Sequence, residues 1–443
     1  MATRNTTSTP SEGPTSRKAS RTRIRPGVAV RSFDPFSTSA FYSARTFFEA
    51  ASRSRRLESA VDAGPNSANA EIEYVRMRSR WTYANDSFYR NACRQIANNA
   101  VSYGIKPIIK DKKLLKLWNR WCKEADVRGK LTFYGIQHML GFTVPRDGEG
   151  FVRFRERRPE DMRSGVPFQL QLLEPDHVPL TKTELLPNGN RIISGVELSA
   201  IERVVSYWML DYHPKDMFLG RSTEPRPVPA HDVMHLYMPD RFTGTRGYPW
   251  GASSLNTSES LRSYELFELE RKKGQAGFLG VLKKPRLATD DAGPIEVDEG
   301  DEEEEVTVAP MEPNSVMVVP DDYDFVLEQP TQTDSNYVPY RREAMAGMAV
   351  AMGLAVEHVS MNWQFLNERQ ARIVLNEVMR FIYAVQDHMF IQQLCEPVWR
   401  RFVSAVLMHD LWRLPEGMDI EDVMDVEWMP PTRGYINPLQ EAQ

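Results

Sequence analysis

The sequence predicts an α+β fold, because strand-like and helix-like patterns occupy different stretches of the chain. Four strand-like runs follow one another between residues 150 and 210, and a Pro-Asn-Gly-Asn turn at 187–190 precedes the third of them. A heptad-spaced series of apolar residues predicts a long helix over 367–394. Residues 252–356 read as two helices joined by a short β-containing insert. We therefore expect a mixed domain, then a helical hairpin, then a helical C-terminal region.

The composition excludes several classes of protein. Of the 443 residues 41% are hydrophobic, which is enough for a sizeable core in two or three domains. The three cysteines, Cys93, Cys122 and Cys395, are far apart, so they indicate neither a disulfide framework nor a cysteine zinc site. No apolar run reaches the roughly 18 residues of a membrane span, and the N-terminus lacks the apolar segment of a secretion signal. We expect a soluble protein in a reducing compartment, with no membrane partner.

The charge is unevenly distributed. Residues 1–60 hold eleven basic and four acidic residues, a net charge of +7, so the overall charge of −5 leaves −12 for the rest of the chain. We expect residues 1–72 to form a flexible basic arm, and the body to lack the strong positive charge of a nucleic-acid-binding domain. A nucleic-acid-binding scaffold that acts through this arm is one functional hypothesis.

Residues 73–251 predict the mixed α+β domain. Apolar spacing predicts helices over 87–103, 112–123 and 133–140. The strand-like runs that follow cover 150–155, 169–173, 191–198 and 204–210.

The helical hairpin follows this domain. Its first helix, 252–277, has acidic residues early and basic residues late, and its few apolar residues spread around the helix, which favours contacts on more than one side. The return helix, 337–356, contains thirteen consecutive uncharged residues at 344–356, many of them small. Small residues let helices approach closely, either in the core of one chain or between repeated subunits. The candidate subunit-contact residues are Leu261, Tyr264, Ala346, Ala349 and Gly353, and we expect Ala349→Leu to weaken assembly by overpacking.

The insert at 278–336 combines strands with an acidic loop. The runs FLGVLKKP and NSVMVVP are strand-like, and eight acidic residues occupy the ten positions 296–305 between them. Like charges at this density repel one another, so we expect a solvated loop.

The start of the long C-terminal helix carries its own signal. Asn367 followed by Gln370 predicts a capping box, and Pro397 predicts the start of a further helix. The apolar face of the long helix should consist of Ala371, Leu375, Val378, Ile382, Val385 and Met389.

Residues His231 and His235 make the only arrangement that is similar to a metal-enzyme motif, and a zinc metallopeptidase is the enzymatic hypothesis. The flanking residues favour a strand, on which positions four apart are separated by roughly 13 Å. We find no phosphate-binding glycine loop and no nucleophile elbow in the sequence. We therefore predict no enzymatic activity, no cofactor and no metal.

Several segments, taken in order, resemble the lambda-like portal proteins of tailed bacteriophages. The resemblance begins at about residue 73 and covers most of the chain. It is carried by SFYRNACRQIANNAVSYGIKP, LTFYGIQHMLGF, DGEGFVRFRERRP, FQLQLLEPDHV, NGNRIISGVELSAIERVVSYWML, VPAHDVMHLYMPDRFTGTRGYPWGASSL, GLAVEHVS, QLCEPVWRRF and INPLQEAQ.

The resemblance implies a dodecameric ring at a unique capsid vertex, through which double-stranded DNA is packaged and later ejected. It implies a portal-type subunit with an α/β wing, a two-helix stem, a small β-containing clip and long C-terminal helices. On this template the parts are the wing 73–251, stem helices 252–277 and 337–356, the clip 278–336, the channel loop 357–366, and 367–443 as long helix, wing return and reduced crown.

The resemblance also implies partners and a location. These are the terminase large subunit, head-completion and tail-connector proteins, and the major capsid and scaffold proteins, with assembly in the host cytoplasm and a final place in the virion. The implied channel-loop residues are His358, Val359, Ser360, Met361, Asn362, Trp363 and Gln364. The implied clip residues that face terminase or connector proteins are Lys283, Lys284, Glu302, Glu303, Glu304 and Glu305. The sequence departs from many relatives at 367–370, where Asn-Glu-Arg-Gln replaces a Ser-Ser-Ala-Arg run, and in ending near INPLQEAQ.

Overall fold

The computed structural model describes most of the chain within the compact unit Arg45–Gln443. Helices and antiparallel sheets are both present, which confirms the α+β prediction. Most of the predicted arm and clip, and the C-terminal tail, lie outside the described residues. The described residues are 47–51, 63–216, 224–277, 281–283, 324–326, 337–364, 366–415 and 417–431.

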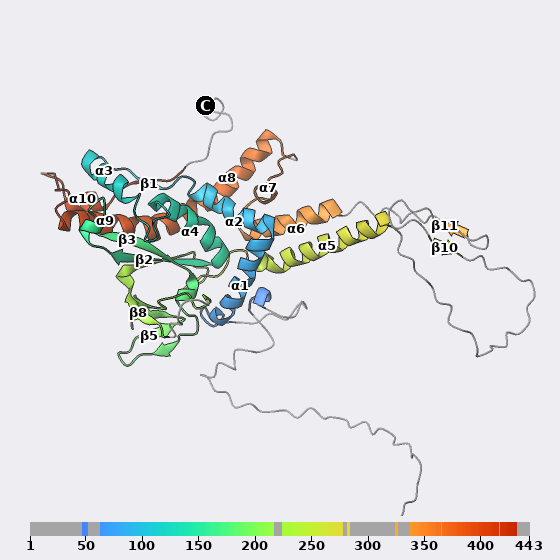
Figure 1. Cartoon of the computed structure of the whole chain (residues 1–443), viewed down its shortest axis with the longest axis horizontal. Coiled ribbons are helices and arrows are strands. Elements are labelled where there is room, and N and C mark those ends of the chain that lie inside the picture. The colour runs from blue at the N-terminus through green and yellow to red at the C-terminus, as the bar shows by residue number, and fades with distance from the viewer. Residues whose placement is uncertain are drawn as a thin grey trace, which may run out of the picture. The chain divides into compact units, whose positions relative to one another are not determined.

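Two antiparallel sheets form in the stretch predicted as the mixed domain (Figure 1). Their strands are β2 (Glu149–Glu156), β3 (Phe168–Leu173), β4 (Glu184–Leu185), β5 (Arg191–Ile193), β6 (Val196–Leu198), β7 (Val204–Met209), β8 (Arg226–Pro229) and β9 (Val233–Tyr237). One sheet has the order β3-β2-β9, and the other is a meander in the order β4-β5-β6-β7-β8. Phe151 of β2 meets Tyr207 of β7 in a buried cluster that joins the two sheets.

The strand predicted over 191–198 is in fact a hairpin. Ile193 of β5 pairs with Val196 of β6, so only Ser194 and Gly195 connect the two strands. Both connecting residues have positive φ, 51° and 84°, which is the backbone of a tight type I′ turn. The pair Ser194-Gly195 is therefore the local signal for a turn, although the stretch 191–198 was predicted as a single strand.

Both edges of the three-stranded sheet are covered. On the outer side of β9, the Gln393 side chain accepts a hydrogen bond from the Tyr237 N–H (3.0 Å) and donates one to the Tyr237 carbonyl (3.1 Å). On the outer side of β3, the main chain at Ala125 and Val127 pairs with both main-chain groups of Leu170. These contacts occupy the outward main-chain groups of Tyr237 and Leu170, which hinders pairing with another strand at those positions.

The helices pack on one side of the three-stranded sheet and continue into the hairpin. They are α1 (Asn69–Asn85), α2 (Ser87–Ala100), α3 (Lys112–Trp121), α4 (Phe133–Asp147), α5 (Leu255–Gly277), α6 (Tyr337–Ala351), α7 (Val356–Ser360), α8 (Glu368–Ala384), α9 (Glu396–Met408) and α10 (Ile420–Met424). Two short sheets complete the description. These are β1 (Lys106–Pro107) with β12 (Trp428–Met429), and β10 (Val281–Lys283) with β11 (Asp324–Val326).

Helix α1 was not predicted, and it begins inside the stretch assigned to the arm. Its buried face is largely polar, with Asn69, Arg76 and Ser79 among the covered residues. Hydrophobic periodicity does not detect such a helix, because the usual arrangement of apolar residues inside and polar residues outside is reversed.

The predicted long C-terminal helix exists, but it changes its winding halfway. The capping box of Asn367 and Gln370 is present in both directions, which confirms the predicted start. After α8 the chain continues as a π-helical segment, Val385–Cys395, and Pro397 lies in the first turn of α9 as predicted.

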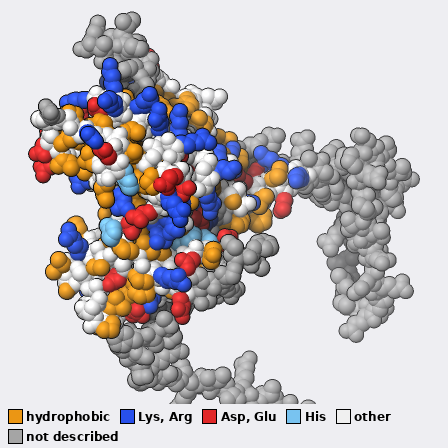
Figure 2. Space-filling view, turned by 60° about the vertical axis from the view of Figure 1, so that its left-hand side comes forward, with side chains coloured by type: hydrophobic (Ala, Val, Ile, Leu, Met, Phe, Trp, Pro, Cys, Tyr) orange, Lys and Arg blue, Asp and Glu red, His pale blue; other side chains and the backbone are white. Residues whose placement is uncertain are grey.

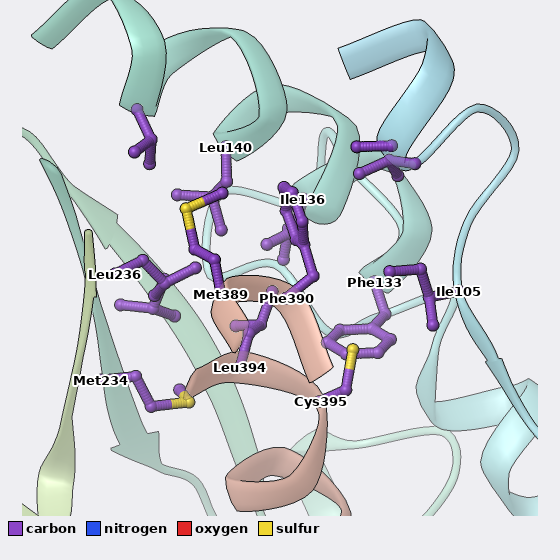
Figure 3. Packing of buried hydrophobic residues seen from close by; sticks show 14 of the residues in the cluster. Ile105, Phe133, Ile136, Leu140, Met234, Leu236, Met389, Phe390, Leu394 and Cys395 are labelled. Carbon is purple, nitrogen blue, oxygen red and sulfur yellow. The ribbon is translucent and has the colours of Figure 1, made fainter. Parts of the chain in front are cut away.

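The main core forms where this π-helical segment crosses α4 and β9. In Figure 3, Met389, Phe390, Leu394 and Cys395 point toward Ile136 and Leu140 of α4 and toward Met234 and Leu236 of β9. All of these side chains are buried. The predicted apolar face of the long helix is confirmed from Val378 onward, where the side chains enter this core.

Candidate functional site

Helices α5 and α6 pack side by side as the hairpin predicted from the sequence (Figure 1). Leu261 of α5 is buried among Ala344, Met345 and Met348 of α6. Further along, the Tyr264 ring meets Tyr340 with centroids 4.9 Å apart, and Arg341 pairs with Glu265 at 3.0 Å. Hydrophobic contacts of Leu261, aromatic contacts of Tyr264 with Tyr337 and Tyr340, and the ion pair of Arg341 with Glu265 hold the two helices together.

The hairpin exposes large apolar side chains on more than one side. At 100° per residue, Leu269 lies about 80° from the inward-facing Leu261 in one direction, and Phe267 lies about 120° away in the other. Phe267 is 68% exposed and Leu269 is 49% exposed. On α6, Val338 and Val350 are also exposed. Such residues favour a protein partner, because exposed apolar area gains free energy when it is covered.

The apolar surface of the hairpin continues onto α1. Tyr74, Met77 and Trp81 recur at helical spacing on the exposed side of α1. Trp81 is 53% exposed, and the Arg262 guanidinium of α5 lies 4.9 Å from its ring centroid. We call Tyr74, Met77, Trp81, Leu266, Phe267 and Leu269 the apolar stem surface.

The predicted subunit-contact residues lie mostly inside the chain. Leu261 is 2% exposed and Ala349 is fully buried, so neither side chain can reach a neighbouring subunit in this conformation. Tyr264 and Ala346 are half-buried. Gly353 has a φ of 69°, and an added Cβ would lie 2.8 Å from the Phe381 ring, so this glycine serves the turn after α6. The two-sided spread of apolar residues on α5 was the better signal for surface contacts.

The predicted channel-loop residues form one short helix and the turn that follows it. His358 and Val359 are buried in α7, where their carbonyl oxygens accept hydrogen bonds from the Asn91 side chain at 2.8 and 2.9 Å. Ser360 is half-buried at the end of that helix. The next four residues, Met361, Asn362, Trp363 and Gln364, are exposed, and Met361 adopts a left-handed φ of 54°. The structure therefore brings these residues to the surface on the short connection to α8.

His358 is a buried side chain of α7. Burial lowers its pKa, and its Nδ1 has no hydrogen-bond partner among the residues that the structure describes. The ring of Trp363 packs edge-on against it at 5.4 Å between centroids. The ring contact fixes the turn against α7.

The predicted clip is described only in part. Lys283 ends β10, whose partner strand is β11 at Asp324–Val326, beyond the predicted run at 314–320. The run at 314–320 lies outside the described residues, as do Lys284, Glu302, Glu303, Glu304 and Glu305.

A buried ionic cluster joins α1, β2, β9 and the loop before α5, and sequence reasoning missed it. The Glu149 carboxylate accepts hydrogen bonds from Arg76 (2.8 Å), Arg246 (2.9 Å), the His235 Nε2 (2.8 Å) and the Gly247 N–H (3.0 Å). Despite full burial, which opposes ionisation, the guanidinium groups and His235 lower the pKa of Glu149 well below its ordinary value. Arg246 also donates to the carbonyl oxygens of Val178 and Ser194. The cluster ties the two sheets to α1, and its role is structural.

The histidine pair does not share a face that could hold one ion. His235 is buried against Glu149, whereas the His231 side chain is 74% exposed in the turn before β9. Within the described ranges, the group of ligand-type side chains close enough for a metal is Glu174, Asp176 and His213. Arg80 already pairs with both carboxylates, at 3.2 and 2.7 Å, so this group is an ion-pair cluster.

The cysteines lie in the interior of the fold. Cys93, Cys122 and Cys395 are buried, and burial raises the pKa of each thiol, which makes them poor nucleophiles. In the part of the chain that the structure describes, no helix combines the length and the apolar character needed to cross a bilayer.

Comparison with solved structures finds distant likenesses to particle necks. The neck of an empty gene transfer agent particle matches with a TM-score of 0.46 at 12% identity, over 80% of this chain and 82% of that chain. The neck of the native particle, computed with C12 symmetry, matches with a TM-score of 0.45 at 12% identity, over 80% and 82%. Similarity at this level says nothing about assembly.

Comparison with known sequences is more specific. A probable portal protein of Halomonas phage phiHAP-1 is 24% identical over 422 residues, which cover 90% of this chain and 79% of that protein. Residues 53–386 match the family described as phage portal protein, lambda family. That family is structural and non-enzymatic, so the metallopeptidase hypothesis is wrong. Because the match covers well over half of the sequence, this chain belongs to the lambda family of phage portal proteins.

Proposed function

We propose that this chain forms a closed ring, a dodecamer, at a unique capsid vertex of a phage particle. The ring would act as the conduit for double-stranded DNA during packaging and ejection. It would be assembled in the host cytoplasm with the scaffold and major capsid proteins, and would remain in the virion.

The apolar stem surface is the observation that carries this proposal. A ring subunit has two neighbours and meets them through two different faces, which a heterologous contact closed by rotation requires. Leu269 and Phe267 lie to either side of the inward-facing Leu261, so α5 offers apolar area in both directions. Covering this area between subunits would remove it from water, which favours assembly.

The proposed channel loop suits a passing duplex. Its exposed residues, Met361, Asn362, Trp363 and Gln364, are uncharged, and residues 356–366 contain no Lys or Arg. Each phosphate contact strengthens binding to DNA, so a loop without cations would let the duplex slide. The turn is fixed at its base by Asn91 and by the capping box at Asn367, which would keep it in place while DNA moves.

The clip is the proposed docking site for the terminase large subunit and, later, for head-completion and tail-connector proteins. Its candidate residues combine cations with a run of acids, which favours polar, exchangeable contacts over permanent ones. They are Lys283, Lys284, Glu302, Glu303, Glu304 and Glu305.

Native mass spectrometry and electron microscopy of the purified chain test the ring. We expect closed rings for the wild type and loss of rings for Phe267→Glu with Leu269→Glu, because buried carboxylates would oppose the contact. Ile201→Glu, at a residue that is 79% exposed on the five-stranded sheet side, is the matched control and should assemble normally. A wild-type chain that stays monomeric at high concentration would overturn the proposal.

A further inference from the structure

Helix α3 carries a strip of cations on its exposed side. Lys112, Lys113, Lys116 and Arg120 fall within about 100° of the helix circumference. The buried Leu114, Trp118 and Trp121 lie on the opposite side, where the two tryptophans pack against Phe133, Trp399 and Phe402. Lys123 extends the strip beyond the end of the helix. We call Lys112, Lys113, Lys116, Arg120 and Lys123 the α3 basic face, and all five are exposed.

The acidic residues of the same stretch form no ion pairs with this face, because their carboxylates are turned toward neutral N–H groups of the fold. Asp111 accepts from the N–H groups of Lys113 and Leu114 and from the Trp412 indole. Glu124 accepts from two N–H groups of the 163–164 turn, and Asp126 accepts from three N–H groups of its own loop.

The α3 basic face is left without counter-charges. None of its five side chains lies within ion-pair distance of a carboxylate among the described residues. Exposed Lys110 precedes it, and exposed Arg128 and Lys130 follow it. In Figure 2, Lys and Arg side chains gather on the upper part of the face, and α3 lies in the upper part of Figure 1.

This pattern opposes the stability of the helix. Lys112 and Lys113 stand in the first turn, where the helix dipole disfavours positive charge. Lys112 with Lys116, and Lys116 with Arg120, are like-charge pairs four residues apart, and both pairs are unfavourable. The helix is stabilised by its buried side, which holds Leu114, Trp118 and Trp121. Because the cations do not stabilise the helix, an anionic ligand explains their presence on one side better.

We propose that the α3 basic face binds the phosphate backbone of double-stranded DNA without regard to sequence. Four of its five cations are lysines, which act as point charges and do not read bases by paired hydrogen bonds. Its helical part spans roughly 12 Å at 1.5 Å per residue, about a third of a turn of the duplex. This contact is separate from the channel-loop candidates, because α3 packs on α4 and α9 and not on the stem.

A second copy of this chain is the less favoured ligand. A second copy would have to offer an exposed acidic surface, and the candidate is the stretch 419–427. This stretch lies close to the start of α3 in the same chain, because the Ile108 N–H donates a hydrogen bond to the Glu427 carbonyl. A ring contact joins different faces of neighbouring subunits, so a basic and an acidic patch on the same face do not meet.

The salt dependence of DNA binding tests the proposal in the full-length chain, with a 30-base-pair duplex of random sequence as the probe. The face variant is Lys112→Gln, Lys116→Gln and Arg120→Gln. The control variant removes the same charge from the five-stranded sheet through Arg191→Gln, Arg203→Gln and Arg226→Gln. Three lost phosphate contacts should reduce the slope of log affinity against log salt by about 2.7. Between 50 and 200 mM salt, the wild-type affinity should therefore fall by about 40-fold more than that of the face variant.

The control variant should keep the wild-type slope, and both variants should form the same assemblies as the wild type in native mass spectrometry. An unchanged slope for the face variant, or an equal change in both variants, overturns the proposal. Loss of assembly in the face variant alone would make the face a subunit contact and would also overturn it. If the wild type binds polyglutamate more tightly than DNA, and the face variant does not bind polyglutamate, then the ligand is an acidic protein and the proposal is wrong. If the wild type forms no rings, the proposed role as a DNA conduit is contradicted. The comparison of salt dependence between the wild type and the face variant would still test DNA binding by the α3 basic face.

Discussion

At the scale of single residues, the Glu149 carboxylate is the shared acceptor of the buried ionic cluster. Glu149→Gln leaves the guanidinium groups of Arg76 and Arg246 buried with no anion between them. We expect a loss of about 3–5 kcal/mol in the free energy of unfolding, measured by chemical denaturation. Glu202→Gln removes an exposed carboxylate paired with Arg191 and should change it by less than about 1 kcal/mol. Equal effects of the two variants would contradict the structural role of the cluster.

The same cluster predicts how stability changes with pH. Burial lowers the pKa of His235 below its ordinary 6.5, so the unfolded chain takes up this proton first and stability falls as the pH drops below 6.5. The pKa of Glu149 lies far below its ordinary 4.5, so its stabilisation is present above pH 4.5 and is lost as the pH falls further.

His235→Gln separates the two stages, because an amide N–H can still donate to Glu149. Melting temperatures at pH 7.5, 5.5 and 4.0 should show a smaller drop between 7.5 and 5.5 in this variant than in the wild type. An identical profile would mean that His235 does not titrate as its burial requires.

The cluster could not be predicted from the sequence, since its members come from α1, β2, β9 and the loop before α5. No spacing links Arg76 to Glu149 or to Arg246, and only the folded chain brings them together. By contrast, the strand assignment at His235 needed only its immediate neighbours and is confirmed.

At the scale of elements, Ala349 in α6 tests the packing of the hairpin. Ala349 is fully buried in the main core cluster. We therefore expect Ala349→Leu to lower the folding stability of the subunit, whereas the sequence alone suggested an effect on assembly. Overpacking should lower the free energy of unfolding by about 1–3 kcal/mol, measured by thermal or chemical unfolding.

Gly347 on the same helix is the matched comparison, since an added Cβ there meets nothing within 4 Å. Gly347→Ala should leave stability unchanged or raise it by about 0.5–1 kcal/mol, because alanine favours the helix. Destabilisation by Gly347→Ala, with none by Ala349→Leu, would refute this account of the hairpin.

Elements with a local signal were predictable and the others were not. Helices α3 and α8 were predicted because the spacing of their apolar residues is a property of contiguous residues. The cap at Asn367 is a second local signal for α8. Helix α1 was missed because its buried face holds Arg76 and Ser79, whose partners lie elsewhere in the chain. The π-helical winding at 385–395 likewise has no local pattern that distinguishes it from an α-helix.

At the scale of the whole molecule, the apolar stem surface predicts that α1 takes part in assembly. Trp81 is 53% exposed, so Trp81→Glu should change the melting temperature of the monomer little and reduce ring formation at least tenfold in native mass spectrometry. Tyr212→Glu, at a residue of similar exposure on another surface, should do neither. Normal rings from Trp81→Glu would restrict the contact to α5 and α6.

Net charge was a poor guide at this scale. The −12 carried by residues 61–443 suggested a body with no strongly basic surface, yet the α3 basic face holds five exposed cations. The sum misleads because it does not show where the charges lie: Asp111, Glu124 and Asp126 are turned toward N–H groups of the fold, whereas the cations project from the surface. A basic surface of this kind can be recognised only when the folded structure shows where each charged side chain lies.

The amide of Gln393 has a consequence for a subunit that is waiting to assemble. An unpaired strand edge invites pairing with the same edge of another copy, which leads to fibril-like aggregates. By occupying both main-chain groups of Tyr237, one glutamine side chain blocks that wrong partnership at β9. Newly synthesised copies should therefore be less prone to aggregate through this end of β9.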